Sequence, residues 1–427
     1  MPRVDALRTF IWIALALAGA GTLAHFVVAL RRLWLSLRVT PRLDGYTDRD
    51  AAGLGRVCVI VPAHNEARVI ERVALALVAQ DHPALRIVFA LDRCTDETRA
   101  ILERAVAGDG RVEIIEIDEC PEGWAGKTNA LRVAAEESAA ARDADLLLFL
   151  DADTEPAPSC VRAAAALLEE GGHDLVSLLG RLSFRRWFER VVQPMTSLEL
   201  MRQNPLSRVN RPRDRTSFAN GQFMLFRRSA YEALGGHERV KDELLEDLAF
   251  ARALKADGRS WVVALAGPML LVRMYGSWPA FCAGWKRIFI ESVNRRPDRL
   301  RAYARRVRLA YAIAPALSLI GVVAASAALA RGAGGAGPVV ALAACAGGLG
   351  AWLLFLLGTL GAQGAPAVSL LASPAGAWLT GRILRGAAED LERNRGVRWG
   401  GRLYTDLAPR TPARLARDAT AATVTDA

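Results

Sequence analysis

Residues 146–154 read LLLFLDADT, an apolar run that ends in two aspartates, Asp151 and Asp153. Five apolar residues in succession are typical of a strand buried on both faces of a sheet in an α/β protein. Side chains two positions apart on a strand share a face, so the two carboxylates can converge on one cation. Oxygen ligands together with a diphosphate suit Mg²⁺ or Mn²⁺. Aspartate is also common in turns, so the stretch alone leaves a simple turn open.

Four short segments have the pattern of strands, and helical patterns lie between them. The strand patterns cover residues 57–61, 86–91, 111–117 and 146–150, and an intervening helix covers 127–138. Strands that alternate with helices predict an α/β fold with a Rossmann-like, mostly parallel sheet and flanking helices. Ligands of such sheets bind at the carboxyl ends of the strands.

Polar residues stand at these predicted carboxyl ends. Pro62 is expected to end the first strand, and Asn65 and Glu66 are expected to begin the next helix. Asp92 ends the second strand, and the two aspartates of LLLFLDADT follow the fourth. Parallel strands end at one edge of a sheet, so residues far apart in the sequence are expected to meet there. This convergence favours a binding site over a set of unrelated turns.

Lys127 stands out because the chain uses arginine almost everywhere. The 55 basic residues include only four lysines. Residues 123–128, GWAGKT, come close to an ATP-binding P-loop but lack its first glycine at the required spacing, so we exclude that motif. A lysine after two glycines, at the start of a helix, suits a diphosphate. An ordinary solvated lysine is the alternative.

Two adjacent acids, Glu246 and Asp247, follow a less regular region, 181–236, that is expected to hold loops and helices. They fall near the start of a predicted helix, 242–254. Acids in a first turn can simply complement the helix dipole. The alternative is that one of them is a general base.

Composition points to a membrane rather than to nucleic acid. Of 427 residues, 52% are hydrophobic, and the net charge is +10. The basic residues lie beside apolar stretches and form no nucleic-acid-binding tail, which indicates a membrane surface as the partner. The six cysteines are scattered without a C-x-x-C or a Cys/His cluster, so the pattern indicates neither a zinc site nor a disulfide framework.

Three uncharged segments, 10–30, 309–330 and 338–360, are long enough to span a bilayer. Arginines follow the first segment where a signal peptide would have a cleavage site, so we interpret it as an uncleaved anchor. The positive-inside rule then places the N-terminus outside and the following domain in the cytoplasm. The segment 366–380 has only 15 residues and is expected to be re-entrant or interfacial.

These features predict five regions and a multi-pass protein of a bacterial-type inner (plasma) membrane. Residues 276–308 are aromatic and basic, as expected of an amphipathic segment at the interface. The predicted regions are an N-terminal anchor (1–38), a cytoplasmic α/β domain (52–275), the interfacial segment (276–308), a C-terminal membrane region (309–380) and an arginine-rich cytoplasmic tail (381–427).

Six motifs, taken together and in order, carry a family resemblance. They are PAHNE, Asp92 with DET after it, GWAGKTNAL, LDADT, NGQFMLFRR and LLEDLAFARAL. Over residues 57–254 the chain resembles family-2 glycosyltransferases of the GT-A fold. The GW-K-R segment, the C-terminal spans and a late RWGGRLYTD are similar to the hopene-associated glycosyltransferases, a layout shared with carotenoid-acid glycosyltransferases.

The resemblance implies roles for the residues already singled out. Asp247 would be the catalytic base, and Asp153 with Asp151 would hold Mg²⁺ or Mn²⁺. The implied substrate-binding residues are Pro62, Asn65 and Glu66 in the nucleotide pocket, Asp92 at the base or ribose, Lys127 near the diphosphate, Asp151 at the nucleotide, and Glu246 and Trp285.

The expected activity is metal-dependent, inverting transfer of one hexose-type sugar from a nucleotide sugar, a UDP-sugar by the resemblance, to a lipid acceptor. The acceptor would be a hopanoid or another polyprenyl lipid. The Q-x-x-R-W motif of processive members is not found, which argues against a polysaccharide synthase. Two alternatives stay open: a nucleotidyltransferase on the same kind of sheet, and a non-catalytic membrane lipid-binding or scaffold protein that retains the fold.

Overall fold

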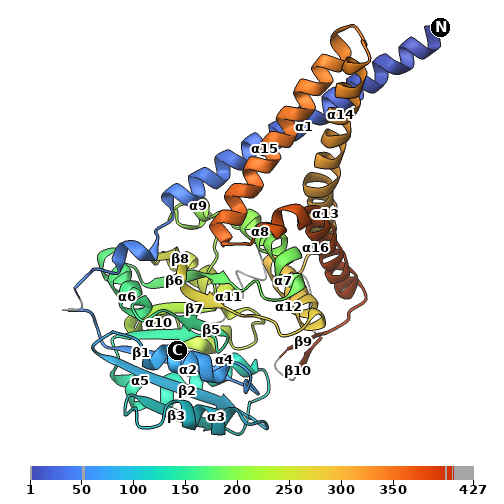
Figure 1. Cartoon of the computed structure of the whole chain (residues 1–427). Coiled ribbons are helices and arrows are strands. Elements are labelled where there is room, and N and C mark those ends of the chain that lie inside the picture. Colours follow the sequence, from blue (N-terminus) through green and yellow to red (C-terminus); the bar gives the residue numbers. More distant parts are fainter. Residues whose placement is uncertain (1, 51–52, 400–401, 406, 408–427) are drawn as a thin grey trace. The chain divides into compact units, whose positions relative to one another are not determined.

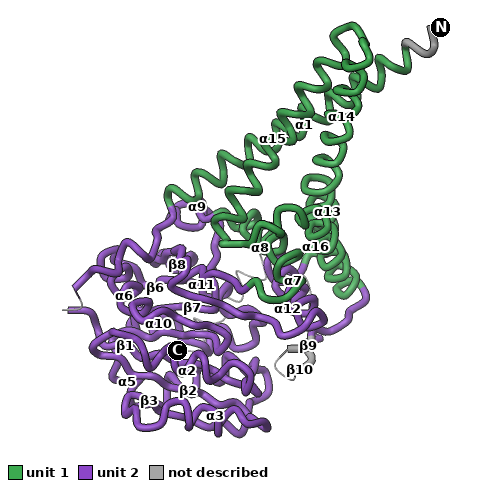
Figure 2. Tube along the Cα trace, in the orientation of Figure 1, with its two compact units in different colours: residues 1–39, 184–205, 296–392 green, residues 40–183, 206–295, 393–427 purple. Residues whose placement is uncertain are grey.

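The computed structural model describes residues 2–50, 53–399, 402–405 and 407, which form two compact units (Figure 1, Figure 2). The helical unit contains the described residues up to Val39, together with Phe184–Pro205 and Arg296–Glu392. The sheet unit contains Thr40–Ser183, Leu206–Arg295 and the described residues after Glu392.

The sheet unit is built on an eight-stranded sheet with the order β3-β2-β1-β4-β7-β6-β8-β5. β3, β2, β1 and β4 run parallel to their neighbours, as do β6 and β8, whereas β7 is antiparallel to both β4 and β6 and β5 is antiparallel to β8. The strands are β1 (Val57–Ala63), β2 (Leu85–Asp92), β3 (Val112–Ile117), β4 (Leu146–Leu150), β5 (Thr154–Pro156), β6 (Leu175–Leu182), β7 (Phe223–Arg227) and β8 (Trp261–Val272).

Helices flank this sheet, so the predicted fold class is confirmed: a mixed, mostly parallel open sheet with flanking helices, resembling the GT-A fold. The helices of the unit are α2 (Ile70–Val78), α3 (Thr98–Ala105), α4 (Gly126–Glu137), α5 (Ala139–Asp143), α6 (Cys160–Glu170), α9 (Leu206–Val209), α10 (Arg228–Ala233), α11 (Glu246–Ala256) and α12 (Trp278–Ser292), with 3₁₀ turns at Leu43–Tyr46 and Gly236–Val240. A separate two-stranded hairpin, β9 (Val397–Trp399) and β10 (Arg402–Tyr404), follows near the C-terminus.

The core explains why LLLFL forms β4. All five of its residues are buried, and alternate side chains point to opposite faces. Leu148 and Leu150 join the aliphatic core that includes Leu167 of α6. On the other face Phe149 packs against Phe226, with ring centroids 5.9 Å apart. The continuous apolar pattern therefore reflects a strand covered on both sides.

Three local predictions near the sheet edge are wrong. Pro62 lies inside β1 and does not end it. The strand tolerates it because β4 pairs with β1 only as far as Ile60, so Pro62 pairs on one side alone. The helix expected at Asn65–Glu66 begins at Ile70. The region expected to hold loops and helices contains a central strand, β7.

The helical unit contains three helices that are long and apolar enough to cross a membrane, as predicted. They are Ala6–Val39, Pro297–Ala330 and Ala336–Gln363. The elements of the unit are α1 (Pro2–Val39), α7 (Trp187–Val191), α8 (Gln193–Gln203), α13 (Pro297–Arg308), a π-helical turn (Leu309–Ile313), α14 (Ala314–Ala330), α15 (Ala336–Gln363) and α16 (Val368–Glu392).

Small residues let these helices pack closely. A Cβ added to Gly348 of α15 would lie 2.6 Å from the carbonyl oxygen of Gly19 in α1, so the two backbones touch. Apolar side chains on the outside remain exposed, among them Phe10 and Val323. Such a surface is expected to contact lipid. The segment 366–380 belongs largely to α16, a single helix that runs on to Glu392.

Candidate active site

The carboxyl edge of the sheet brings together several separate segments. β1 and β2 are parallel, with Ala63 opposite Leu91, and β1 is also parallel to β4. The residues that follow these strands therefore meet at one edge, as the sequence predicts. β7 is antiparallel to β4, with Phe223 opposite Leu150. The segment that precedes β7 consequently reaches the same edge.

Lys127 lies between two carboxylates at this edge. It is the second residue of α4, and its Nζ is 2.6 Å from Asp151 Oδ1 and 2.6 Å from Oε1 of Glu246, the first residue of α11. Burial alone would lower the pKa of the lysine, but the two carboxylates outweigh burial and raise that pKa. Burial likewise favours neutral Glu246, but Lys127 lowers the pKa of this acid below its ordinary value. The cluster therefore holds a charged ammonium group.

Asp153 and Glu66 place two more acids around Asp151. Burial, followed by the charges of Asp151 and Glu66, raises the pKa of Asp153 to about 8. Burial, followed by the charges of Asp151 and Asp96, raises the pKa of Glu66 to about 7. Burial is the main cause of both shifts, and the neighbouring carboxylates add to it. A bound cation would relieve the repulsion among these acids.

The side chains fit a divalent cation that takes further ligands from a substrate. Asp153 Oδ1 is buried and has no hydrogen-bond partner in the part of the chain that the structure describes. Within the same described residues, no group of three or more His, Cys, Asp or Glu could hold a metal. Mg²⁺ usually takes one or two carboxylates together with substrate phosphates. Because Lys127 already pairs with Asp151 Oδ1, metal binding by the Asp151/Asp153 pair stays a prediction.

Asp247 is held by two backbone N–H groups. Gly221 N donates to Asp247 Oδ2 at 2.7 Å, and Leu248 N donates to Oδ1 at 2.7 Å. Burial, followed by the charge of Glu246, raises the pKa of Asp247 to about 6. A Cβ at Gly221 would lie 3.2 Å from Asp247 Oδ2 and 3.3 Å from Glu246 Oε1. A glycine in the NGQF motif thus allows the close approach that fixes the predicted base.

Asp92 also lies at the edge, but its carboxylate already has a partner. Arg93 Nε and Nη2 donate to Asp92 Oδ1 and Oδ2 at 2.8 and 2.7 Å. A Cβ at Gly126, the first residue of α4, would lie 2.9 Å from Asp92 Oδ2. The pair therefore packs against the helix that carries Lys127. A contact of Asp92 with the base or ribose stays a prediction, and it would be made together with Arg93.

Asn65 and Glu66 shape the loop after β1. Asn65 has a left-handed backbone, with φ of 58°. Its Oδ1 accepts from the backbone N–H groups of Thr95 and Asp96 at 2.8 and 3.2 Å. Glu66 N donates to Thr98 Oγ1 at 2.8 Å. These contacts join the loops after β1 and β2 into one wall. The predicted nucleotide contacts of Asn65, Glu66 and Pro62 remain untested.

Two residues near the acids were missed by the sequence reasoning. Arg287 of α12 donates from Nη1 to the carbonyl of Leu244 at 2.8 Å and also hydrogen-bonds the Tyr275 side chain. The positive charge of Arg287 acts to lower the pKa of Asp151. The negative charges of Asp153 and Asp151 act to raise the pKa of Tyr275. The GW-K-R segment gave the one available hint for Arg287, while Tyr275 has no distinguishing pattern.

Trp285, a predicted substrate-binding residue, packs inside the sheet unit. It is 2% exposed, and its ring centroid is 6.1 Å from that of Phe281 and 5.4 Å from that of Phe289. This position gives Trp285 a packing role on α12. A substrate contact stays a prediction that would require its ring to become accessible.

Residues 58–235 match the family model described as Glycosyl transferase family 2. The match covers less than half of the 427 residues. It includes Glu66, Lys127 and both aspartates of LDADT, and it ends before Glu246 and Asp247. Over this segment the chain is similar to that family. No curated protein matches the chain.

Several solved structures show a weak likeness to the chain. The mannosyltransferase PcManGT from Pyrobaculum calidifontis, in complex with GDP-Man and Mn²⁺, is 18% identical with a TM-score of 0.45, over 89% of this chain and 99% of that one. TarS from S. aureus is 17% identical with a TM-score of 0.37, over 59% and 39%. Glucosyl-3-phosphoglycerate synthase from Mycobacterium tuberculosis, in complex with Mn²⁺, UDP-Glc and phosphoglyceric acid, is 22% identical with a TM-score of 0.37, over 57% and 81%. At these scores the likenesses carry no argument about chemistry.

Proposed function

We propose that this chain is a membrane-bound, inverting glycosyltransferase that moves one sugar from a nucleoside diphosphate sugar to a lipid hydroxyl. The observation that supports the proposal most directly is a partly buried ammonium group, that of Lys127, close to a carboxylate, that of Asp247, whose direction is fixed by hydrogen bonds. Lys127 is paired with Glu246, and Asp247 is the next residue on the same helix. The similarity of residues 58–235 to Glycosyl transferase family 2 supports it.

Asp247 would act as the general base. The acceptor oxygen forms a bond to the anomeric carbon, the bond from that carbon to the diphosphate breaks, and the acceptor proton passes to Asp247. Its two backbone donors fix the direction of the carboxylate. A pKa of about 6 leaves it largely ionised at pH 7. A positioned base contributes on the order of 10²–10⁴-fold to the rate. A single displacement inverts the anomeric carbon and needs no covalent intermediate.

Lys127 would stabilise the leaving diphosphate. Its ammonium group can exchange a carboxylate partner for phosphate oxygens at the start of α4, where the helix N-terminus also favours anions. Asp153, with Asp151, would hold Mg²⁺ or Mn²⁺. When bound, that ion would neutralise charge on the departing nucleoside diphosphate. Metal dependence and the choice between the two ions are parts of this proposal.

The nucleotide would bind along the wall formed by the loops after β1 and β2. Pro62, Asn65 and Glu66 would line this pocket, and Asp92 with Arg93 would meet the base or ribose. A UDP-sugar is the donor that the sequence resemblance favours. Glu246 would contact the substrate through its pairing with Lys127.

The three apolar helices support a membrane location and therefore a lipid acceptor. The arginine distribution favours a catalytic domain on the cytoplasmic side of a bacterial-type inner membrane. A hopanoid or another polyprenyl lipid is the acceptor class that we propose. A membrane-embedded hydroxyl would approach the site from the lipid surface.

The test uses the full chain in detergent, with nucleotide sugars, lipid acceptors and a divalent metal. We expect release of nucleoside diphosphate and a glycosylated lipid only when the metal is present. Asp247→Asn should abolish transfer while nucleotide binding persists. Asp242→Asn, at an exposed acid five positions earlier, is the matched control and should keep wild-type turnover.

Three outcomes would contradict the proposal. Wild-type turnover by the Asp247→Asn variant would remove Asp247 as the base. Pyrophosphate as the product would identify a nucleotidyltransferase. Failure to bind any nucleotide in the presence of metal would favour a non-catalytic scaffold.

A further inference from the structure

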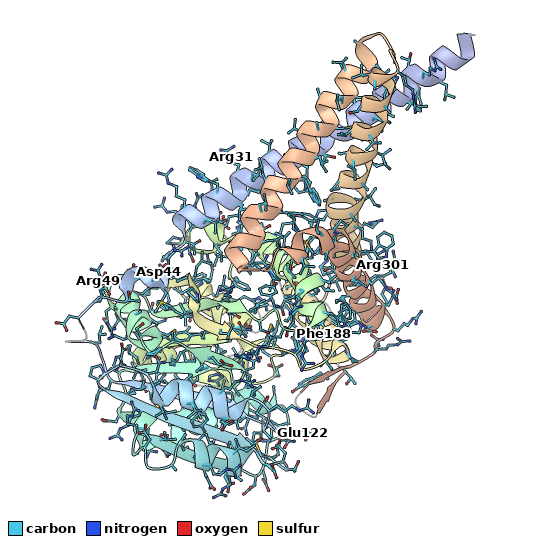
Figure 3. All side chains as sticks on the ribbon, in the orientation of Figure 1. Arg31, Asp44, Arg49, Glu122, Phe188 and Arg301 are labelled. Carbon is cyan, nitrogen blue, oxygen red and sulfur yellow. The ribbon has the colours of Figure 1, made fainter. Side chains whose placement is uncertain are left out.

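A cavity of about 310 Å³ lies between α13 and α16 in the helical unit. Two residues from each helix supply its charged lining at a spacing of four, which places each pair on one face of its helix. The lining residues are Arg301, Ala304 and Arg305 of α13 and Arg385 and Glu389 of α16. The surroundings of Arg301 on α13 can be followed in Figure 3.

The charge of this cavity is positive and only partly compensated. Three guanidinium groups face one carboxylate. Arg301 forms an ion pair with Glu392. Within the described ranges, Arg305, Arg385 and Glu389 take part in no side-chain hydrogen bond or ion pair. Two arginines with free donor groups therefore face the same open space, an arrangement that matches a phosphate ligand.

The position of α13 along the chain puts this cavity at one end of a candidate membrane span. α13 continues through Leu309–Ile313 into α14, and the whole stretch Pro297–Ala330 is one candidate span. Arg305 lies four residues before Leu309, or about 6 Å along a helix. The polar layer on each side of a bilayer is about 5–7 Å thick. If the span begins near Leu309, the Arg305 guanidinium group lies within that layer.

A tryptophan near the middle of α16 lies beside the last residue of α13. The guanidinium carbon of Arg308 lies 4.7 Å from the ring centroid of Trp378. Trp378 is nevertheless 48% exposed, and Leu371, about two helical turns before it, is 84% exposed. Half-exposed tryptophan beside arginine is typical of the interface between membrane and water.

We propose that the cavity between α13 and α16 binds the phosphate of an anionic phospholipid head group. Arg305 and Arg385 donate to the phosphate oxygens, and Arg301 adds positive charge from the next turn. The bound lipid links α13 to α16 and fixes the pair at the membrane surface. The inference rests on the membrane location proposed above and is independent of sugar transfer.

The experiment measures lipid binding by the purified full chain in neutral detergent, with no nucleotide sugar present. Native mass spectrometry counts the dioleoyl phosphatidylglycerol or dioleoyl phosphatidylcholine that the protein retains during a titration. We expect the wild type to prefer phosphatidylglycerol. At about fivefold per arginine, the double variant Arg305→Gln/Arg385→Gln should bind it about twenty-five-fold more weakly.

The matched control is Arg299→Gln/Arg382→Gln. Both residues are exposed, lie on the same two helices and lie outside the cavity lining, and the loss of charge is equal. This control should change binding less than about twofold. Equal losses in the two double variants would reduce the effect to general surface charge and overturn the proposal. Equal binding of the two lipids by the wild type would also overturn it.

A second variant tests the sign of the effect. Glu389→Gln removes the one carboxylate that lines the cavity and should strengthen phosphatidylglycerol binding several-fold. If Arg305→Gln/Arg385→Gln does not fold, Glu389→Gln alone tests whether the cavity binds phosphatidylglycerol. Weaker phosphatidylglycerol binding by Glu389→Gln would contradict the proposal. Inorganic phosphate serves as the competitor. Displacement of the lipid at equal concentration would assign the cavity to free phosphate instead.

Discussion

Replacement of Lys127 by methionine should destabilise the sheet unit, because it leaves one buried acid, Glu246, and one partly buried acid, Asp151, without their common cation. In the wild type, the ammonium group contacts Asp151 and Glu246 at 2.6 Å each. The Glu246 side chain is 6% exposed and that of Asp151 is 27% exposed. Breaking a buried ion pair from one side costs roughly 3–5 kcal/mol. The partial exposure of Asp151 favours the lower end, about 3 kcal/mol.

The assay is thermal unfolding of the full chain in detergent, followed by near-UV circular dichroism. For a domain of this size, a loss of about 3 kcal/mol lowers the apparent Tm by about 6–12 °C. Lys241→Met is the matched control, since that lysine is exposed and, within the described residues, its side chain forms an ion pair with exposed Glu238. It should lower the apparent Tm by less than about 3 °C.

The difference in apparent Tm between the wild type and the Lys127→Met variant should depend on pH. Lys127 lowers the pKa of Glu246 in the folded wild type, so this contribution is present at neutral pH and is lost as the pH falls through the folded pKa. In the variant, burial raises the pKa of both acids, so they bind protons more readily as the pH falls. Protonation removes the free-energy cost of keeping these carboxylates ionised without the ammonium group. The difference in apparent Tm should therefore be largest near pH 8 and should narrow toward pH 5. A constant or widening difference, or a loss no greater than that of Lys241→Met, would refute the reasoning.

Two further predictions concern the chemistry. Asp247, with a pKa raised to about 6, must be ionised to act as a base. The value of kcat/KM should therefore rise with pH around a midpoint near 6. A kcat/KM profile that is flat from pH 5 to 7 would exclude Asp247 as the base. Asp153, with a pKa raised to about 8, should release about one proton when Mn²⁺ binds with a nucleoside diphosphate at pH 7. Isothermal titration calorimetry in two buffers of different ionisation enthalpy measures that proton, and Asp153→Asn should abolish its release.

The parts of the fold that depend on local pattern could be predicted from the sequence. The bounds of β4 were predicted correctly, because both of its faces are buried and its end is marked by an acid. The meeting of Lys127 with Asp151 was also foreseeable, since parallel strands end at one edge and a helix begins beside them. Lys127 was recognisable as well, because the chain contains few other lysines.

The parts that depend on strand pairing could not be predicted. β7 inserts antiparallel between β4 and β6, and its apolar pattern does not say which strands it joins. This insertion brings Gly221 to Asp247. Arg287 lies on α12 and Tyr275 lies just before it, so both approach the acids through the packing of this region. The GW-K-R segment hinted at Arg287, and no local pattern marks Tyr275. Pro62 was misread because its tolerance depends on where pairing with β4 stops.

The charges at the sheet edge would give a physical reason for the proposed metal dependence. Five carboxyl groups are gathered there, those of Glu66, Asp151, Asp153, Glu246 and Asp247, and their charges act on one another. The lysine and the arginine whose charges act on them are Lys127 and Arg287. Full ionisation of these seven groups gives them a net charge of −3 (five negative and two positive charges). A nucleoside diphosphate sugar is itself an anion and would be repelled from such a surface. Burial, followed by the charges of neighbouring carboxylates, raises the pKa of Asp153 and Glu66 and so favours their protonated forms. A divalent cation can replace those protons and bridge the carboxylates to the diphosphate. Without metal, donor binding should therefore strengthen as the pH falls. With metal, donor binding should strengthen as the pH rises toward 8.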